Sequence, residues 1–569
     1  MAGHDMSDMR AMTPPEKMPV PVKMTGIGNS HITIKATPEA QAWFDQGLSL
    51  QHDFWDYEAE KAFEQGIRVD PQCAMCWWGL ARSLGFRDLN QVGLGKHALE
   101  EAGKLMSHAS ESDRFYIEAA QASMNAKDDD NEQEKTILRN LVKKYPHDTQ
   151  AKILLAESLG DGYDDAGEPK AGTKEKIAIL EEVLKEAPND SAANHYWIHA
   201  IEPGNHPELA IKSAEVLASL APTSGHMVHM PGHIYYRVGD YATAEHWFTA
   251  SMEADERYMR EQHVDVDNDW NYIHNLMYGI ANLMEQGKLE QANALSDHAA
   301  GGRGKVSESL YIWSARDQMT RLSNRLPVAL RLGDWDAVLT MTGQVKLEGE
   351  KTANLRALAE ELGDYARGMK AVENGDATSA RSASDAMDAG LWRLQQRAAD
   401  KKAAEKRAKK DDKKDEPPME ELMPDALPDP ILKSLSIASE ELRAGVLVAM
   451  GQLDEAKKVY SDAQLEEKNL GYHEPPMYIR PVGETEAAVL VRAKDYAGAK
   501  AAYEEALKER PNSGFGLYGL AQVKEAQGDA TGARDAYAAF LKAWANADAT
   551  LPQVAHAKRV VSGESLAEK

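Results

Sequence analysis

A spacing of small and bulky residues that recurs every 34 positions constrains the fold of this chain more than any other feature. The unit from Ala40 to Cys73 has a bulky residue at its fourth position, small residues at the eighth and twentieth, an aromatic residue at the twenty-fourth and proline at the thirty-second. These residues are Trp43, Gly47, Ala59, Phe63 and Pro71. A unit of this kind is a pair of antiparallel helices that cannot bury its apolar face alone, so neighbouring units stack on one another.

The spacing is that of the tetratricopeptide repeat (TPR). Near the C-terminus, Ala499, Tyr503, Ala506 and Pro511 fit the same frame. Aromatic residues make up only 7% of the chain and the mean hydropathy is -0.54, as expected for stacked amphipathic helices rather than for sheets. We therefore expect an all-α fold, a TPR-type superhelical solenoid of about a dozen helix pairs.

Changes in composition divide the chain into seven segments. We expect a disordered Met- and Pro-rich leader over 1–37, N-terminal repeats over 38–190, His-rich repeats over 191–300, further helix pairs over 301–392, C-terminal repeats over 431–548 and a tail over 549–569. The remaining segment, 393–430, is rich in Lys and Asp and then in Pro. It predicts a helix that frays into a disordered insertion.

The formal net charge of -26 argues against a nucleic-acid partner, because binding a polyanion depends on clustered Lys and Arg. No stretch approaches 18 consecutive apolar residues, so we expect no membrane span. The sequence leaves the oligomeric state open.

Six histidines gather in the central repeats once the register is extended. Pro188 and Pro222 make Ser191 and Gly225 first positions of their units, and the turn at Gly287 makes Ile273 another. The first helices of these units then carry His195, His199, His226, His229, His233 and His274. Because first helices of TPR units line the concave groove, we expect the six imidazoles to point into one cavity.

The spacing of these histidines predicts a transition-metal site. His195 with His199, and His229 with His233, are HxxxH pairs one helical turn apart, and such pairs can share a divalent ion. We expect these four to be the ligands, with His226 and His274 as alternates. Copper is expected if Met227 or Met230 supplies a thioether, and zinc if neither does.

Two features bear on this site. Pro231 interrupts the expected helix and predicts a kink or a late start near His229, which would displace His226 most. Residues expected to orient ligands or to line the groove are Glu202, Met227, Met230, Tyr236, Arg237, Trp270, His473 and Glu474.

Three functions fit this pattern: a metal site, a concave groove that binds a protein or peptide segment, and histidines that only pack and hydrogen-bond. A metal-dependent enzyme would also need an open coordination position and a general base, for which Glu202 and Glu474 are the candidates. No Ser or Cys lies beside a His in a nucleophile elbow, so whether the chain is an enzyme stays open.

Four motifs, DPQCAMCWWGLARSLG, HYWIHAIEPGNHPELA, GHMVHMPGHIYYRVGDYATA and YHEPPMYIRPVGETEAAVL, span most of the chain. Through them the chain resembles a large family of bacterial TPR-repeat proteins. The resemblance implies the fold and a periplasmic or otherwise extracytoplasmic location, with the cytoplasm as the alternative, but it implies no activity. An extracytoplasmic location favours a disulfide between Cys73 and Cys76, and a buried thiol pair is the alternative. Met477 to Arg480 depart from the family's more aromatic segment, which leaves the roles of His473 and Glu474 open.

Overall fold

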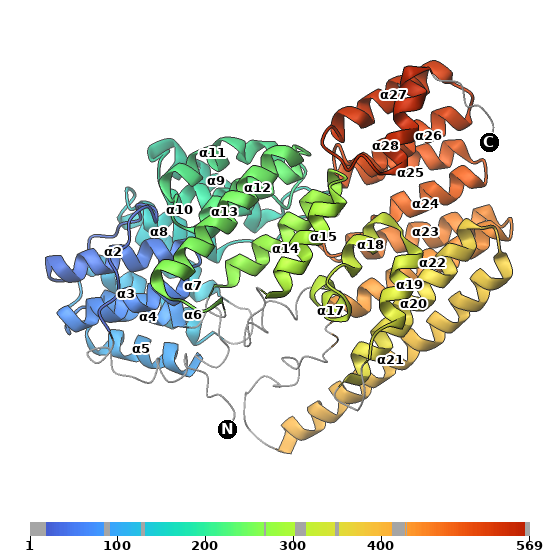
Figure 1. Ribbon diagram of the computed structural model, residues 1–569. Coiled ribbons are helices and arrows are strands. Elements are labelled where there is room, and N and C mark those ends of the chain that lie inside the picture. The colour runs from blue at the N-terminus through green and yellow to red at the C-terminus, as the bar shows by residue number, and fades with distance from the viewer. Residues whose placement is uncertain are drawn as a thin grey trace. The chain divides into compact units, whose positions relative to one another are not determined.

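The protein is all-α throughout the part that the computed structural model describes, which is residues 19–84, 92–126, 131–164, 166–266, 269–301, 315–346, 352–411, 427 and 429–563. These residues form 26 α-helices and one short 3-10 helix, with no β-strand (Figure 1). The all-α prediction is confirmed. Among the described helices, none has the length and apolar character needed to cross a bilayer.

The chain forms two compact units. The first comprises Met1–Tyr235 and His246–Tyr272, and the second comprises Tyr236–Glu245 and Ile273–Lys569. The boundary falls inside three helices: α12 (Gly225–Arg237), α13 (Tyr241–Gln262) and α14 (Trp270–Glu285). Residues 191–300 therefore do not form a segment of their own. Each TPR unit contacts mainly its neighbours, so a chain of such units carries no sequence mark where one compact unit ends.

The first unit contains helix pairs that follow one another along the chain. They are α2 (Pro38–His52), α3 (Asp56–Val69), α4 (Ala74–Leu84), α5 (Val92–Lys104), α6 (Glu111–Met124), α7 (Glu132–Lys144), α8 (Thr149–Ser158), α9 (Ala171–Glu186), α10 (Ser191–Ile201), η3 (Pro207–Ala210), α11 (Ile211–Leu220) and most of α12 and α13.

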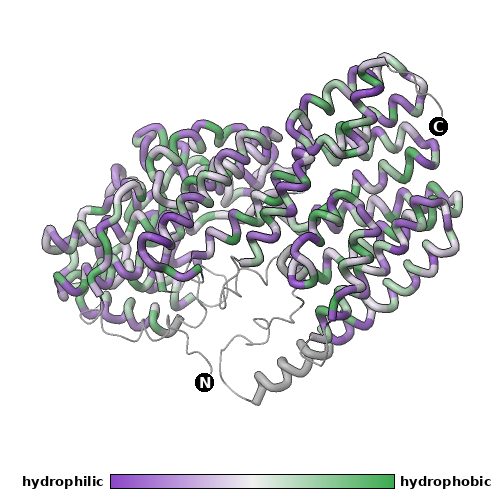
Figure 2. Tube along the Cα trace, in the orientation of Figure 1, coloured by the Kyte–Doolittle hydropathy of each residue, from purple (hydrophilic) through white to green (hydrophobic). Residues whose placement is uncertain are grey.

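The second unit continues the same arrangement. After α14 it contains α15 (Leu289–Gly301), α17 (Ala315–Leu322), α18 (Leu326–Leu332), α19 (Trp335–Gly343), α20 (Ala353–Glu373), α21 (Ala377–Asp411), α22 (Asp429–Ala449), α23 (Leu453–Lys468), α24 (Val482–Arg492), α25 (Tyr496–Glu509), α26 (Gly514–Ala526), α27 (Ala530–Ala543) and α28 (Pro552–Ser562). Helices throughout both units carry apolar and polar residues together, as amphipathic helices do (Figure 2).

Small residues let the helices approach closely. A Cβ atom on Gly47 would lie 2.7 Å from the ring of Phe63, and one on Gly79 would lie 2.2 Å from it. The fully buried Phe63 ring of α3 therefore fills space that only glycine leaves open on both α2 and α4. This contact explains why the repeat has a small residue at its eighth position and an aromatic residue at its twenty-fourth.

Acceptor side chains begin several of these helices. Asp148 and Asp190 accept hydrogen bonds from the backbone N–H groups of Ala151 and Ala193, which starts α8 and α10. At the start of α4 a disulfide joins Cys73 to Cys76, with 5.3 Å between the two Cα atoms.

The two ends of the described chain are more ordered than the sequence predicts. Residues 1–18 lie outside the described part, but Ile27, Ile32 and Ile34 are buried in the core of the first unit. Asn29 also exchanges two 3.0 Å hydrogen bonds with Ser191 at the start of α10. A disordered leader through residue 37 is therefore wrong for this stretch, because scattered isoleucines gain their burial only from tertiary contacts.

The tail prediction is also wrong. Helix α28 follows the last predicted pair and packs on α27, with Val554 and Ala557 buried. Pro552 stands at its N-terminus, where proline favours a helix start. In the 393–430 insertion, α21 extends to Asp411, and 412–426 and 428 lie outside the described residues.

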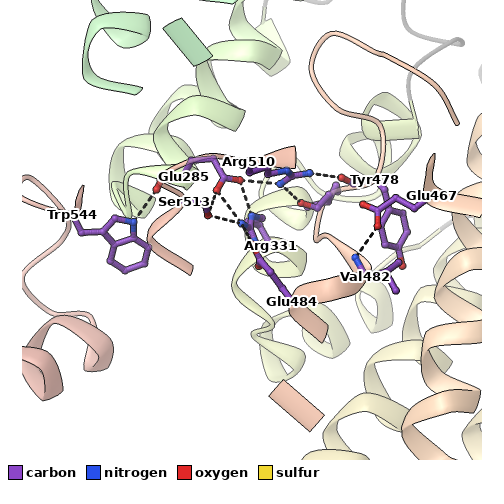
Figure 3. Close-up of polar contacts among 10 residues, drawn as sticks. Glu285, Arg331, Glu467, Tyr478, Val482, Glu484, Arg510, Ser513 and Trp544 are labelled. Atoms are coloured by element: carbon purple, nitrogen blue, oxygen red, sulfur yellow. Dashed lines mark hydrogen bonds and ion pairs between the residues drawn. The ribbon is translucent and has the colours of Figure 1, made fainter. Parts of the chain in front are cut away.

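A buried group of charged side chains ties together helices of the second unit (Figure 3). Arg331 of α18 makes two 2.9 Å hydrogen bonds to Glu285 of α14 and also bonds Glu484 of α24. Arg510 donates to Glu285 as well, and Ser513 donates to it at 2.6 Å. Burial alone would raise the pKa of Glu285, but the two guanidinium groups lower it to about 2. Removing one member of such a buried group typically costs about 3–5 kcal/mol.

Candidate metal centre

Five of the six histidines lie in the first unit, on two helices. His195 and His199 are one turn apart on α10, while His226, His229 and His233 follow one face of α12. Helix α12 begins at Gly225 and contains Pro231 in its interior. A late start of this helix is therefore not observed, and His226 lies within the helix, where it can take part in the cluster.

Three imidazoles converge through their Nε2 atoms. The Nε2 atom of His195 lies 3.1 Å from that of His226 and 3.1 Å from that of His199. One nitrogen from each of the three rings lies within 4.8 Å of the others. We call His195, His199 and His226 the three-histidine group. The sequence predicts His229 and His233 as the partners of His195 and His199, whereas the structure places His226 in these contacts.

The opposite nitrogen of each ring in this group faces an acceptor. His195 Nδ1 lies 2.6 Å from the backbone carbonyl of His52, and His199 Nδ1 lies 2.6 Å from Glu202 Oε1. His226 Nδ1 lies 3.2 Å from Asn271 Oδ1. The amide nitrogen of Asn271 donates to Asp255 at 2.7 Å, so the amide oxygen is the atom that faces His226.

These acceptors fix the protonation of the rings. A carbonyl oxygen and a carboxylate can only accept, so Nδ1 is the protonated nitrogen when each ring is a neutral imidazole. Each Nε2 then has a lone pair, and three such lone pairs point at one another. Metal-binding histidines are oriented in this way, by a carboxylate or carbonyl behind the ring.

The other two of these five histidines form a second contact. His229 Nε2 and His233 Nε2 are 2.5 Å apart, and we call these residues the two-histidine group. His233 Nδ1 lies 2.9 Å from Glu202 Oε2. Glu202 therefore accepts from one ring of each group, with His199 on one oxygen and His233 on the other.

Burial disfavours the charged forms of His195 and His233. His195, His229 and His233 have no exposed surface, and His226 is 5% exposed. Burial, reinforced by the neighbouring His199, lowers the pKa of His195 well below its usual value, and burial also lowers the pKa of His233. Burial would raise the pKa of Glu202, but His199 and His233 hold it well below its usual value. The carboxylate thus stays ionised as the acceptor for both rings.

Aromatic residues cover the three-histidine group. The Phe54 ring, in the turn between α2 and α3, lies 4.7 Å from His195, 5.6 Å from His199 and 5.3 Å from His226 between ring centroids. Phe54 has a φ of +56°, a left-handed conformation that bulky residues rarely adopt. Trp270 donates a 2.9 Å hydrogen bond to the Phe54 carbonyl, which holds the turn in place, and its ring packs against His226. Strain of this kind is common at binding sites.

The other residues predicted for the site have different surroundings. Met227 and Met230 are fully buried in an apolar cluster with Ile198 and Ile201, so their thioethers contribute to the core. The second unit contains Tyr236, Arg237, His274, His473 and Glu474. There His274 Nε2 lies 3.8 Å from Glu474 Oε2, His473 contacts the Leu470 carbonyl at 2.8 Å, and Tyr236 packs against Tyr241 and Tyr278.

Sequence reasoning missed Phe54, Asn271 and the carbonyl of His52. No spacing rule connects His52 with His195, which are 143 positions apart. Asn271 lies two residues before Ile273, near the start of α14, and its side-chain oxygen faces His226 of α12.

One comparison with known protein families identifies a repeat in this chain. Residues 485–548 match a family model described as tetratricopeptide repeat. No curated protein matches the chain. Similar solved structures include the APC/C hetero-tetramer Cut9-Hcn1, with 12% identity over 85% of this chain and 76% of that one and a TM-score of 0.34.

Two further similar structures are yeast Tom70 and a human IFIT1 dimer with m7Gppp-AAAA. Tom70 has 13% identity over 92% of this chain and 96% of its own, with a TM-score of 0.26. IFIT1 has 11% identity over 89% of this chain and 97% of its own, with a TM-score of 0.34. The repeat match over residues 485–548 supports a TPR protein, a class suited to protein–protein interaction.

Proposed function

We propose that the three-histidine group binds a transition-metal ion, zinc or copper, and that this site is the functional centre of the first unit. The observation that carries the proposal is the set of three Nε2 lone pairs, each fixed by an acceptor on the opposite ring nitrogen. In the absence of a cation these lone pairs repel one another, so a bound ion would remove an unfavourable contact.

The spacing of the nitrogens supports a tetrahedral ion. Ligands that lie 2.0–2.1 Å from a tetrahedral zinc are about 3.3 Å from each other. The two measured Nε2–Nε2 distances are both 3.1 Å, so little movement would be needed. Three protein ligands leave the fourth position for water or another ligand.

The donor set favours zinc or copper(II) over copper(I). Copper(I) prefers soft thioether or thiolate donors, whereas imidazole suits zinc and copper(II). Met227 and Met230 are packed in the apolar cluster of the first unit and Cys73 is joined to Cys76, so these four sulfur atoms have other roles.

Metal content tests the proposal directly. Protein purified without a chelator and without a nickel column is expected to contain at least one equivalent of metal per chain by elemental analysis. His199→Ala is expected to lose one equivalent; this side chain is 25% exposed, so its truncation disturbs packing less than that of the other ligands. His206→Ala, which removes a 66% exposed imidazole of the same unit, is the matched control and should retain the wild-type content. Substoichiometric metal in the wild type, or equal metal in all three proteins, would reject the site.

A further inference from the structure

A cavity of about 300 Å³ lies wholly within the second unit, between residues of α18, α24, α25, α26 and α28. Glu484 and Arg492 line it from one face of α24. Phe515, Tyr518 and Gln522 line it from one face of α26, since they follow one another at intervals of three and four residues. Because α24 and α26 are the first helices of successive pairs, the cavity belongs to the face that repeat proteins use for binding.

Two of the three arginines that line this cavity in the described part of the chain have carboxylate partners. Arg331 has no exposed surface and pairs with Glu285 and Glu484 (Figure 3). Arg492 is 44% exposed, and its Nη2 atom lies 3.5 Å from Glu373 Oε1. The charges of these two arginines are therefore balanced within the protein.

Arg480, in the turn that precedes α24, is the third arginine and lacks such a partner. Its guanidinium carbon lies 5.7 Å from the centroid of the Trp335 ring. Glu441 lies close enough to feel its charge but accepts hydrogen bonds from Tyr365 and Tyr478 instead. Among the residues that the structure describes, no carboxylate oxygen lies within 4 Å of the guanidinium and no acceptor lies within hydrogen-bond distance of it. Its N–H donors, which suit a carboxylate, are available to a ligand.

Two further features of the wall fit a peptide better than a simple anion. Gln553, at the start of α28, has a buried side-chain oxygen with no hydrogen-bond partner in the described residues, so it can accept from a ligand N–H. The rings of Tyr503 and Tyr518 supply apolar surface. Gly519 lets the Tyr503 ring lie against α26, since a Cβ atom there would be 2.0 Å from that ring. Phosphate has neither an N–H donor nor an apolar surface, whereas a peptide has both.

We infer that this cavity binds a carboxylate of a peptide or protein segment. Arg480 donates to the carboxylate, Gln553 accepts from the peptide backbone, and Tyr503 and Tyr518 contact a neighbouring apolar side chain. Ligand sites typically measure about 300–1,000 Å³, so this cavity has room for only a short stretch of peptide. The chain has a net charge of -26 and repels acidic ligands as a whole, so a local unpaired cation is what such a ligand requires.

Peptide arrays test this inference on the full chain. Three sets of short peptides share the same apolar residues. The first set has an internal Asp or Glu and an amidated C-terminus, the second has a free C-terminal carboxylate and no acidic residue, and the third is neutral, with Asn or Gln and an amidated C-terminus. At least one carboxylate set is expected to bind about 10-fold or more tightly than the neutral set, and the set that binds identifies the source of the carboxylate.

Variants then locate the binding by isothermal titration calorimetry with the tightest peptide. Arg480→Gln is expected to weaken binding by about 10- to 100-fold, because it removes a charge-assisted hydrogen bond. Gln553→Leu keeps the size of the side chain but removes its acceptor, and is expected to weaken binding by about 2- to 10-fold. Arg534→Gln, which changes an exposed arginine of α27 that does not line the cavity, is the control and should bind as wild type does.

Three outcomes would overturn the inference. They are equal binding of the carboxylate and neutral peptides, an Arg480→Gln protein that binds as tightly as wild type, and a wild type that binds inorganic phosphate but none of the peptides. The comparison of peptide sets uses the wild type alone, so the inference stays testable even if Arg480→Gln does not fold. The site lies in the second unit, so failure of the metal proposal for the first unit would not affect it.

Discussion

At the scale of single residues, the feature that matters most is which ring nitrogen of each histidine faces the protein. The Nδ1 atoms of four rings face Glu202, Asn271 and the His52 carbonyl. Three of the Nε2 atoms therefore face one another, and that of His233 faces His229. Glu202 is the residue on which this arrangement depends most, because it is 1% exposed and accepts from two rings at once.

Glu202→Gln is expected to weaken metal binding by about 10- to 100-fold, as is typical when the group behind a ligating histidine is changed. A glutamine has one acceptor oxygen, so it can hold His199 or His233 but presents an N–H group to the other. The measurement is zinc affinity by competition with a chromophoric chelator. Glu208→Gln, which changes a 52% exposed carboxylate that pairs with the surface His206, is the control and should leave affinity unchanged. Equal affinities in the two variants would contradict the role of Glu202.

The sequence predicted all five of these histidines and Glu202, because helical spacing places residues three and four apart on one face. It did not predict their grouping. The sequence predicted His229 as a ligand and His226 as an alternate, whereas the packing of α10 and α12 brings His226 to His195. The thioethers were assigned to the site because they flank the histidines, but Met227 and Met230 point to the apolar side of α12.

At the scale of elements, the packing of helix α20 against helix α21 buries the carboxyl group of Glu361. Glu361 of α20 is 3% exposed, its Oε2 atom has no hydrogen-bond partner among the described residues, and Gly390 of α21 lies against it. Burial, with a smaller contribution from Asp364, raises the pKa of Glu361 to about 8. The folded unit therefore retains a proton that the unfolded chain releases near pH 4.5.

The free energy of unfolding of the second unit is expected to fall as pH rises from about 4.5 to about 8, by about 1.4 kcal/mol per pH unit from this group. Between these two pKa values the folded state binds a proton that the unfolded state has released, so the free energy of unfolding falls as pH rises. Below the unfolded pKa both states bind the proton, and the full stabilisation from this group is present. Glu361→Gln mimics the neutral acid and should remove this slope in urea titrations at several pH values. The exposed neighbouring residue, Glu360, provides the control, and Glu360→Gln should keep the slope. A slope that Glu361→Gln leaves intact would show that other groups cause it.

The repeat frame predicted the helix pairs that lie within it, but not the ordered segments on either side of it. The frame placed Trp43, Phe63 and Gly47 correctly because these residues pack within one pair and its neighbour. It gave no information on Ile27, Ile32 and Ile34 or on α28, because these segments lie outside the frame and gain their order from contacts with units distant in the sequence.

At the scale of the whole molecule, the chain has two units with separate cores, and the proposed metal centre belongs to one of them. A ligand that binds only the folded state stabilises the unit that holds it by mass action. Chelation is therefore expected to lower protection from hydrogen exchange in α10 and α12 of the first unit. Helices α20 to α23 of the second unit should keep their protection. His199→Ala should respond less to the chelator than wild type does, and an equal loss across both units would contradict a metal confined to the first.

The left-handed turn at Phe54 also limits the exposure of the metal centre to solvent. Its ring covers all three imidazoles of the three-histidine group, and Trp270 holds its backbone from behind. Of the five histidines in the three-histidine and two-histidine groups, His199 alone has a quarter of its side chain exposed. We therefore expect an ion, a water molecule or an incoming ligand to reach the centre past the exposed edge of His199 and to leave by the same route.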